Sequence, residues 1–227
     1  VLGGGRVEPV QWAWNMPMGS LSMALDGLSA LFLLPVAVLS GLAAVYGGAY
    51  LRGFRGPTSV GTSWLCYNLL VASMVVLLAA RNGVLFLLAW EVMSLASFFL
   101  VTMENDREEV RQAGWTYLVA THLGTAFLLV MFLLLGRSAG GSMDFVLFGT
   151  GGAGGVIFLL ALVGFGTKAG LIPMHVWLPE AHPAAPSHVS AVMSGVMIKM
   201  GIYGLARTLV LLGTPAEWWG WVLVVIG

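Results

Sequence analysis

Residues 164–173 read GFGTKAGLIP, and Lys168 stands there without a charged neighbour inside an otherwise apolar run. Glycine and alanine residues flank this lysine, so the backbone leaves room for close approach of another helix or for water. Pro173 follows five residues later and removes a helical hydrogen bond, because proline has no backbone N–H. We therefore expect a broken helix near Pro173. Broken helices at membrane depth are tolerated where they line protein-buried or hydrated cavities, and they often mark transport sites.

The composition around this segment is that of an integral membrane protein. Of the 227 residues, 59% are hydrophobic and 9% are charged, whereas about a quarter of the residues in a soluble domain carry charge. The formal net charge is zero, so the chain lacks the excess of positive charge that is typical of nucleic-acid-binding proteins. Cys66 is the single cysteine, so an internal disulfide and a four-cysteine cluster are both excluded.

Apolar stretches long enough to cross a bilayer recur along the chain. A spanning helix needs roughly 20 predominantly apolar residues. This criterion predicts six full spans and the start of a seventh at Trp218; the six lie at 28–51, 64–80, 83–103, 113–135, 154–173 and 186–212. We expect an all-α, polytopic transmembrane bundle. Residues 1–27 would form an extramembrane lead-in, and residues 28–227 a single transmembrane domain that is incomplete at both ends.

The arginines near the ends of the predicted spans do not decide the orientation in the membrane. Arg52, Arg55, Arg107 and Arg111 fall on one side, and Arg6, Arg81, Arg137 and Arg207 on the other. The positive-inside rule does not separate four from four. The arginine positions therefore do not show which end of the spans faces the cytoplasm.

Four titratable residues fall near the middle of four predicted spans, at about the same depth: Glu91, His122, Lys168 and Lys199. An ionised side chain at that depth costs about 2.5–3.5 kcal/mol on insertion scales, so such residues usually pair or line water. A single glutamate–lysine ion pair that only fixes helix packing would leave the second lysine without a carboxylate partner. Because this set contains more basic groups than carboxylates, one basic group has no acidic partner, and this favours a relay in which its proton moves. His122 taken alone fits a core histidine equally well.

The sixth predicted span carries a second candidate pair. His188 and Lys199 are 11 residues apart, which on a regular helix places them within about 20° of each other and roughly 16 Å apart. We expect them to share a helix face lined with small residues. This face would form one half of a hydrated proton pathway, from the membrane midplane to one surface. For the serines of this span, helix packing is the simpler interpretation.

The histidines between residues 175 and 188 suggest two metal-based alternatives. His175 and His188 could hold a haem on one helix, but three prolines lie between them and interrupt that helix. A zinc or nickel site from His175, Glu180, His182 and His188 has no recognised ligand spacing. The sequence therefore predicts no metal and no cofactor in this chain.

Two segments resemble the antiporter-like, proton-conducting subunits of respiratory complex I and related membrane-bound hydrogenases. They are LAWEVMSLASFFLV at 88–101 and GFGTKAGLIPMHVWLPEAHPAAPSHVSAVMSGVMIKMGIYG at 164–204. The sequence of residues 182–204 is most similar to that of the large membrane subunit of hydrogenase-4 and formate hydrogenlyase. The resemblance extends from about residue 20 to the end of the sequence.

The resemblance assigns roles to the residues of the predicted relay. Glu91 matches the family's fifth-helix glutamate, Lys168 the lysine before the break in the seventh helix, and Lys199 the eighth-helix lysine. His122 and His188 match less closely. Family members contain two inverted repeats, each with one broken helix, and this chain would cover the first of them.

The resemblance implies a proton-translocating membrane subunit of a redox-driven complex, of the hydrogenase-4/formate hydrogenlyase or NADH:quinone oxidoreductase type. Glu91 and Lys168 would form a modulating pair, and Lys199 would pass the proton onward. Expected partners are other membrane subunits and a peripheral redox arm, which would hold the Fe–S clusters and the Ni–Fe centre or flavin. The expected location is the inner (plasma) membrane, with the Arg52 side cytoplasmic. Two alternatives stay open: a cation/proton antiporter subunit without a redox enzyme, and an inert membrane scaffold.

Overall fold

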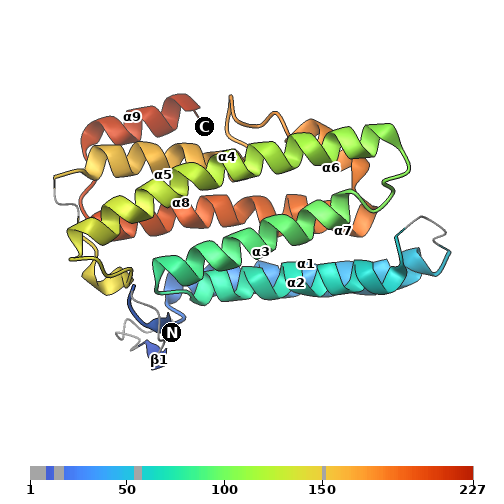
Figure 1. Cartoon of the computed structure of the whole chain (residues 1–227), viewed down its shortest axis with the longest axis horizontal. Helices are drawn as coiled ribbons and strands as arrows, with labels where there is room; N and C mark the ends of the chain where they lie inside the picture. Colours follow the sequence, from blue (N-terminus) through green and yellow to red (C-terminus); the bar gives the residue numbers. More distant parts are fainter. Residues whose placement is uncertain (1–8, 13–17, 54–57, 150–151, 227) are drawn as a thin grey trace.

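The computed structural model describes residues 9–12, 18–53, 58–149 and 152–226. The long helices lie side by side along one axis, and their connections gather at the two ends of the bundle (Figure 1). We call these ends the Asp26 end, where α1 begins, and the Arg52 end, where α1 finishes. Much of the predicted lead-in, residues 1–8 and 13–17, lies outside the described residues.

Five helical segments of the described chain are long and apolar enough to cross a membrane. They are α1 (Gly27–Tyr50) with the 3₁₀ turn η1 (Leu51–Gly53), α2 (Val60–Ala79), α3 (Gly83–Val101), α4 (Glu108–Ser138), and the continuous run of α7 (Ser187–Val192), the π-helical turn η3 (Met193–Met197) and α8 (Ile198–Leu212). The remaining elements are shorter: η2 (Phe145–Leu147), α5 (Gly154–Ala169), α6 (Leu178–Ala184) and α9 (Glu217–Ile226). The helix α4 extends well beyond the predicted span 113–135, because its polar ends continue the helix outside the apolar stretch.

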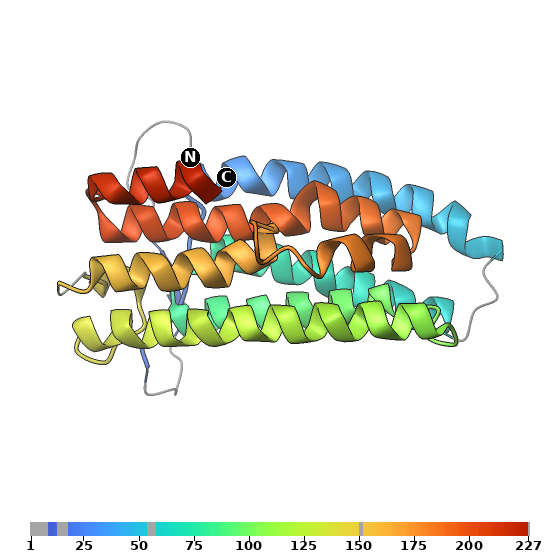
Figure 2. The same cartoon turned by 90° about the horizontal axis from the view of Figure 1, so that it is seen from above.

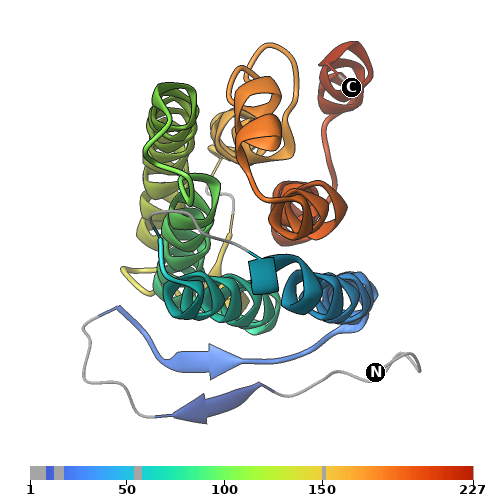
Figure 3. The same ribbon diagram turned by 90° about the vertical axis from the view of Figure 1, so that its right-hand side faces the viewer.

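A two-stranded antiparallel ribbon departs from the predicted all-α fold. Strands β1 (Val10–Trp12) and β2 (Leu21–Met23) pair beside the Asp26 end of the bundle (Figure 1), and the end-on view shows them side by side outside the helices (Figure 3). An isolated bridge between Met23 and Ala80 joins the ribbon to the end of α2. The ribbon lies outside the apolar spans, so hydropathy did not reveal it.

Polar side chains cap three of the spanning helices and explain where they begin. The side-chain oxygens of Asp26, Ser59 and Asn82 accept hydrogen bonds from the first free backbone N–H groups of α1, α2 and α3, respectively. These residue types are the preferred N-caps, since their short side chains can replace the missing helical acceptor.

The helix carrying Lys168 is interrupted about halfway along the bundle (Figure 2). It ends at Ala169, and Gly170 adopts a left-handed conformation with φ of 74°. The N–H of Leu171 then donates to the carbonyl of Gly166 at 2.9 Å, which is the hydrogen bond of a Schellman cap. The next helix, α6, starts at Leu178. The glycine therefore ends the helix.

Pro173 lies inside this interruption and not at its start. The indole Nε1 of Trp177 donates to the carbonyl of Thr167 at 2.7 Å and so satisfies an acceptor that the broken helix leaves free. The same indole ring meets the Tyr117 ring edge-on at 5.1 Å between centroids. The break is thus held by contacts with α4 as well as by its own cap.

Two glycines allow α8 to pack closely against α5. A Cβ atom built at Gly201 would lie 2.6 Å from the carbonyl oxygen of Phe165 and 2.7 Å from the amide nitrogen of Ala169. At Gly204 it would lie 2.3 Å from the Phe165 ring. Small residues let helix backbones approach closely in membranes, and here they place α8 beside the turn that carries Lys168.

Candidate functional site

Lys168 is the centre of the candidate site, and its side chain is almost completely buried at 1% exposure. The ammonium Nζ donates to Tyr117 Oη at 2.7 Å and to Ser94 Oγ at 3.1 Å. It also lies 5.0 Å from the centroid of the Tyr117 ring and 5.9 Å from that of Trp90. Among the described residues, no carboxylate forms an ion pair with it. Hydroxyl groups and aromatic rings therefore solvate this cation.

The break itself favours a positive charge at this position. Lys168 lies in the last turn of α5, where the free carbonyl groups and the helix dipole give the helix end a partial negative charge. The interruption brings this helix end to the middle of the bundle (Figure 2). The local backbone thus offsets part of the cost of burying the ammonium group.

The hydroxyl groups beside Lys168 form a chain from α4 to α3. Tyr117 Oη contacts Ser97 Oγ, and Ser97 Oγ in turn donates to the carbonyl oxygen of Met93 at 2.7 Å. Because that carbonyl can only accept, the hydroxyl proton of Ser97 is used in this hydrogen bond. The Tyr117 hydroxyl therefore donates to Ser97 Oγ and accepts from Lys168 Nζ. Every hydroxyl proton in the chain therefore points away from Lys168, and Tyr117 presents an acceptor oxygen to the ammonium group. Sequence reasoning missed Tyr117 and Ser97, since a tyrosine and a serine in an apolar span carry no distinctive signal.

Glu91 forms its ion pair with His122, and among the described residues it makes no direct ion pair with Lys168; the expected modulating effect of Glu91 on Lys168 stays a prediction. The distance from Glu91 Oε2 to His122 Nε2 is 3.4 Å. Ser94, three residues after Glu91 on α3, occupies the position facing the lysine. Residues three apart on a helix differ in direction by about 60°, and this turns Glu91 toward α4.

The Glu91–His122 pair shares one exchangeable proton. His122 Nδ1 lies 2.9 Å from the carbonyl oxygen of Leu118 and must donate to it, because a carbonyl only accepts. The second ring nitrogen, Nε2, is therefore the one that gains or loses a proton beside the carboxylate. The side chains are 44% and 29% exposed for His122 and Glu91, and Glu91 Oε1 is buried without a hydrogen-bond partner among the described residues.

Lys199 lies at the level of Lys168 but on the outer side of α8. Gly201, which contacts Phe165 and Ala169 of α5, is two residues away and so points in nearly the opposite direction. The Lys199 side chain is exposed, and its Nζ donates to the carbonyl oxygen of Ser194 at 2.5 Å. That carbonyl belongs to the π-helical turn η3.

His188 and Lys199 do not share a face, contrary to the sequence-based expectation. The turn η3 lies between them. A π turn holds one residue more than an α turn, and this rotates the following helix by about 100° relative to the regular spacing. His188 is fully buried among the rings of Tyr50, Trp64 and Tyr67, whereas Lys199 is exposed. Neither ring nitrogen of His188 has a hydrogen-bond partner within the described chain.

The remaining histidines do not assemble a metal site in the described residues, where no group of three or more His, Cys, Asp or Glu side chains could hold an ion. His182 Nδ1 instead contacts Ser190 Oγ at 2.9 Å. A groove of about 600 Å³ runs beside the break between α4 and α5, and mainly apolar side chains line it, among them Trp115, Val119 and Met174.

Comparison with known proteins identifies this arrangement. The family model described as "NADH:quinone oxidoreductase/Mrp antiporter, TM" matches residues 80–227, which include the broken helix and all five predicted relay residues. The chain belongs to the NADH:quinone oxidoreductase/Mrp antiporter family. It is accordingly a multi-pass membrane protein with the antiporter-like fold.

Individual relatives support the same assignment. Hydrogenase-4 component B of Escherichia coli (strain K12) is 41% identical over 215 residues, which are 91% of this chain and 31% of that protein. Formate hydrogenlyase subunit 3 of the same strain is 30% identical over 212 residues, covering 92% of this chain and 33% of that protein. The solved Mrp complex from Dietzia sp. DQ12-45-1b matches with a TM-score of 0.86 at 28% identity, covering 97% of this chain and 24% of that chain. The chain thus spans about a third of the length of the curated relatives.

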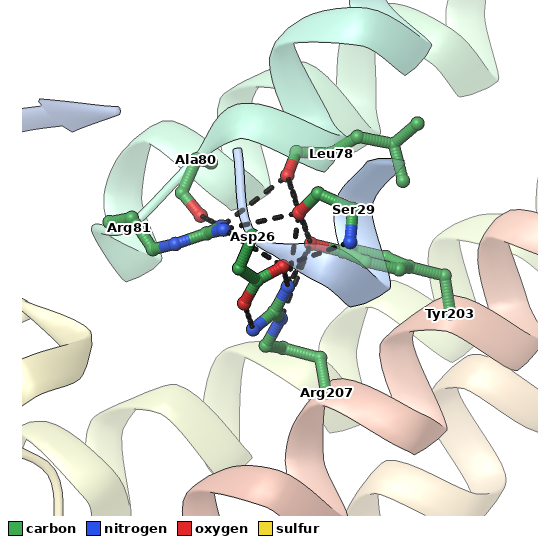
Figure 4. A network of polar contacts seen from close by, with 7 residues as sticks. All are labelled: Asp26, Ser29, Leu78, Ala80, Arg81, Tyr203 and Arg207. Atoms are coloured by element: carbon green, nitrogen blue, oxygen red, sulfur yellow. Dashed lines mark hydrogen bonds and ion pairs between the residues drawn. The ribbon is translucent and has the colours of Figure 1, made fainter. Parts of the chain in front are cut away.

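This member of the antiporter family also contains a partly buried charge cluster at the Asp26 end that sequence reasoning missed (Figure 4). Arg207 forms a two-pronged ion pair with Asp26, with nitrogen–oxygen distances of 2.5 and 2.8 Å. Arg81 reaches the same carboxylate at 3.3 Å. Arg81 and Arg207, which the sequence analysis places on the same side, lie together at this end of the bundle. An arginine inside the predicted span 186–212 was the available signal, because such a residue needs a partner.

Proposed function

We propose that the full-length protein translocates protons as a membrane subunit of a redox-driven complex, of the hydrogenase-4/formate hydrogenlyase or NADH:quinone oxidoreductase type. The observation that carries this proposal is the buried Lys168, which is bound by neutral hydroxyl groups beside a helix break. An ammonium without a direct carboxylate partner can release its proton more readily than one held in a tight ion pair. The family membership supports the same reading.

The described residues suggest an order of proton transfer. Lys168 Nζ holds a proton between Tyr117 and Ser94, and loss of that proton leaves a neutral amine that can accept another. The Glu91–His122 pair gains or loses a proton at His122 Nε2, and the resulting change in the net charge of the pair acts on Lys168 electrostatically and without direct contact. Lys199 is the next carrier, because it lies at the same level as Lys168. Its side chain is exposed and is held by one hydrogen bond to the Ser194 carbonyl, so its amine can swing away from α8.

The proposed partners are other membrane subunits and a peripheral redox arm in the inner membrane, with the Arg52 end cytoplasmic. The partner arm would hold the Fe–S clusters and the Ni–Fe centre or flavin. A cation/proton antiporter subunit without a redox enzyme is the second candidate, favoured by the similarity to the Mrp complex. Co-purification of nickel and iron with the full-length protein supports the hydrogenase type, and its absence together with cation-driven transport supports the antiporter.

We also propose that this chain binds no redox cofactor of its own. The purified full-length subunit, separated from its partners, is expected to be colourless, because Cys66 is its single cysteine in this region and the histidines lack a haem-binding arrangement. The visible absorption spectrum tests this proposal. A Soret band at one haem per chain contradicts it.

Replacing Lys199 with arginine is expected to impair proton translocation as severely as replacing it with alanine. Arginine keeps the positive charge but effectively never deprotonates in proteins, so it can substitute for a structural charge but not for a carrier. The measurement is redox-driven proton uptake into vesicles, with a blot for complex assembly. Proton uptake at the wild-type rate in the Lys199→Arg variant shows that Lys199 is no relay and favours the scaffold alternative.

A further inference from the structure

Trp177 connects the two halves of the broken helix. Its side chain is fully buried, and its indole Nε1 donates to the carbonyl oxygen of Thr167, in the last turn of α5, at 2.7 Å. The backbone carbonyl of Trp177 accepts from the N–H of Ala181 at 2.9 Å and so starts α6. One residue therefore ties the end of α5 to the beginning of α6 across the interruption (Figure 2).

The same side chain contacts the group that accepts the hydrogen bond of Lys168. The ring of Trp177 meets that of Tyr117 edge-on, with 5.1 Å between the centroids and 70° between the ring planes. Tyr117 Oη accepts from Lys168 Nζ at 2.7 Å, and Thr167, whose carbonyl binds the indole, directly precedes Lys168. Trp177 thus contacts both sides of this hydrogen bond: the α5 turn that carries the donor and the α4 ring that carries the acceptor.

These contacts limit how far the donor and the acceptor of the Lys168–Tyr117 hydrogen bond can move apart. The stem of a lysine is long and flexible, so the position of its ammonium group depends on a well-placed acceptor. A neighbour at the edge of the rigid tyrosine ring fixes where the hydroxyl points. Hydrogen bonds weaken steeply when their geometry is lost, and a hydrogen bond to a charged group favours the charged form. The affinity of Lys168 for its proton therefore depends on the contacts of Trp177.

We propose that Trp177 is a positioning residue for proton transfer at Lys168, which it serves by holding the last turn of α5 and the Tyr117 ring in register. The inference rests on the proposed function, because such positioning matters only if Lys168 exchanges protons. Trp177 belongs to the break itself, so a movement of the break changes the Lys168–Tyr117 hydrogen bond. The interruption in this way acts on the lysine through a side-chain contact as well as through the helix dipole.

A purely structural role, in which Trp177 only closes the break, is the competing explanation. Trp177→Phe removes the N–H group that binds Thr167 and part of the ring surface that contacts Tyr117, but it keeps an apolar ring at the site. A structural role predicts less assembled complex with an unchanged pH dependence of transport. A positioning role predicts a changed pH dependence in the complex that does assemble.

The test uses the full-length protein in its assembled complex, reconstituted in liposomes that contain a pH-sensitive dye. The number of protons taken up per electron transferred is measured across the pH range in which the complex turns over. In wild type this number is expected to fall at alkaline pH, where Lys168 is no longer reloaded. In the Trp177→Phe complex the fall is expected about one pH unit lower, because weakening a hydrogen bond to a charged group changes a protonation equilibrium by roughly a factor of ten. An unchanged profile overturns the proposal.

A double-mutant cycle tests whether Trp177 acts through the Tyr117 hydroxyl. Tyr117→Phe alone removes the acceptor, so it is also expected to move the fall in uptake to lower pH. The double variant Tyr117→Phe/Trp177→Phe is expected to behave like Tyr117→Phe, since residues that act through one interaction are not additive. Additive shifts contradict the proposal, because they show that Trp177 acts by a separate route.

Trp219 offers a matched control on another helix that packs against α5. It is 5% exposed, its ring stacks on that of Phe158 with 4.7 Å between centroids, and its Nε1 has no hydrogen-bond partner among the described residues. Phe158 lies about 15 Å before Lys168 along α5. Trp219→Phe is expected to lower the thermal unfolding temperature and to leave the pH profile unchanged. A shift equal to that of Trp177→Phe overturns the proposal, because general loosening of α5 would then explain both.

An isosteric replacement decides the question if Trp177→Phe does not assemble. Benzothienylalanine incorporated in place of Trp177 keeps the shape of the ring and replaces the indole N–H by sulfur, so only the hydrogen bond to Thr167 is lost. The fall in uptake is again expected at lower pH than in wild type, and a wild-type profile overturns the proposal. A wild-type complex that takes up no protons during turnover contradicts the proposed function, and the inference falls with it. Normal wild-type uptake with an unchanged profile in the variant contradicts the inference alone.

Discussion

Replacing Lys168 with methionine is expected to reduce redox-driven proton uptake by about a hundredfold or more, the usual cost of losing a proton-transferring group. Methionine fills a similar volume, so the bundle should still assemble, and the cost of burying a charge disappears. Only the exchangeable proton is lost. Proton uptake by vesicles, normalised to the amount of assembled complex, is the measurement.

Two companion variants sharpen this expectation. Tyr117→Phe keeps the ring that contacts Trp177 but removes the hydroxyl that accepts from Lys168, so a partial loss of uptake is expected. Lys168→Arg is expected to fail like Lys168→Met, because Glu91 is no direct partner that would give a permanent charge a useful role. Uptake at the wild-type rate in the Lys168→Met variant shows that this lysine carries no proton.

Replacing Gly201 with valine is expected to prevent the formation of a stable complex. Already the first side-chain atom would lie 2.6 Å from the Phe165 carbonyl oxygen and 2.7 Å from the Ala169 amide nitrogen. These are backbone atoms and cannot rotate away, so α8 would have to separate from α5. Overpacking of well-packed interiors costs about 1–3 kcal/mol or more, and valine adds two methyl groups beyond the first clash. Blots of the assembled complex and its thermal unfolding temperature measure the loss.

A matched glycine provides the control for this expectation. Gly41 lies within α1, and a Cβ atom there would meet nothing within 4 Å. Gly41→Ala is therefore expected to leave assembly intact, since alanine is the better helix former by roughly 0.5–1 kcal/mol. Normal assembly of the Gly201→Val complex contradicts the close α5–α8 contact.

The positions of the relay residues were more predictable than their partners. Hydropathy placed Glu91, Lys168 and Lys199 within helices, and Gly201 connects the last two at one level. The sequence did not show that Glu91 contacts His122, because the direction of a side chain depends on how its helix is rotated against its neighbours. A difference of about 60° between Glu91 and Ser94 decided which of them faces the lysine.

The sequence by itself determined the features that depend on local chemistry. Apolar stretches determined the membrane spans, the short polar side chains of Asp26, Ser59 and Asn82 determined where helices begin, and Gly170 with Pro173 determined the interruption. Each of these signals acts through backbone conformation or hydrogen bonds within a few residues. They are readable without knowledge of the rest of the chain.

Only the tertiary structure decided the contacts between distant segments. Asp26 and Arg207 are 181 residues apart, and Lys168 and Tyr117 are 51 apart. Such pairs form because helix packing brings two side chains to one place, and no local preference encodes that outcome. The π turn at 193–197 is the clearest case. Its extra residue is accommodated by packing against neighbouring helices, and it directs Lys199 outward while His188 stays buried.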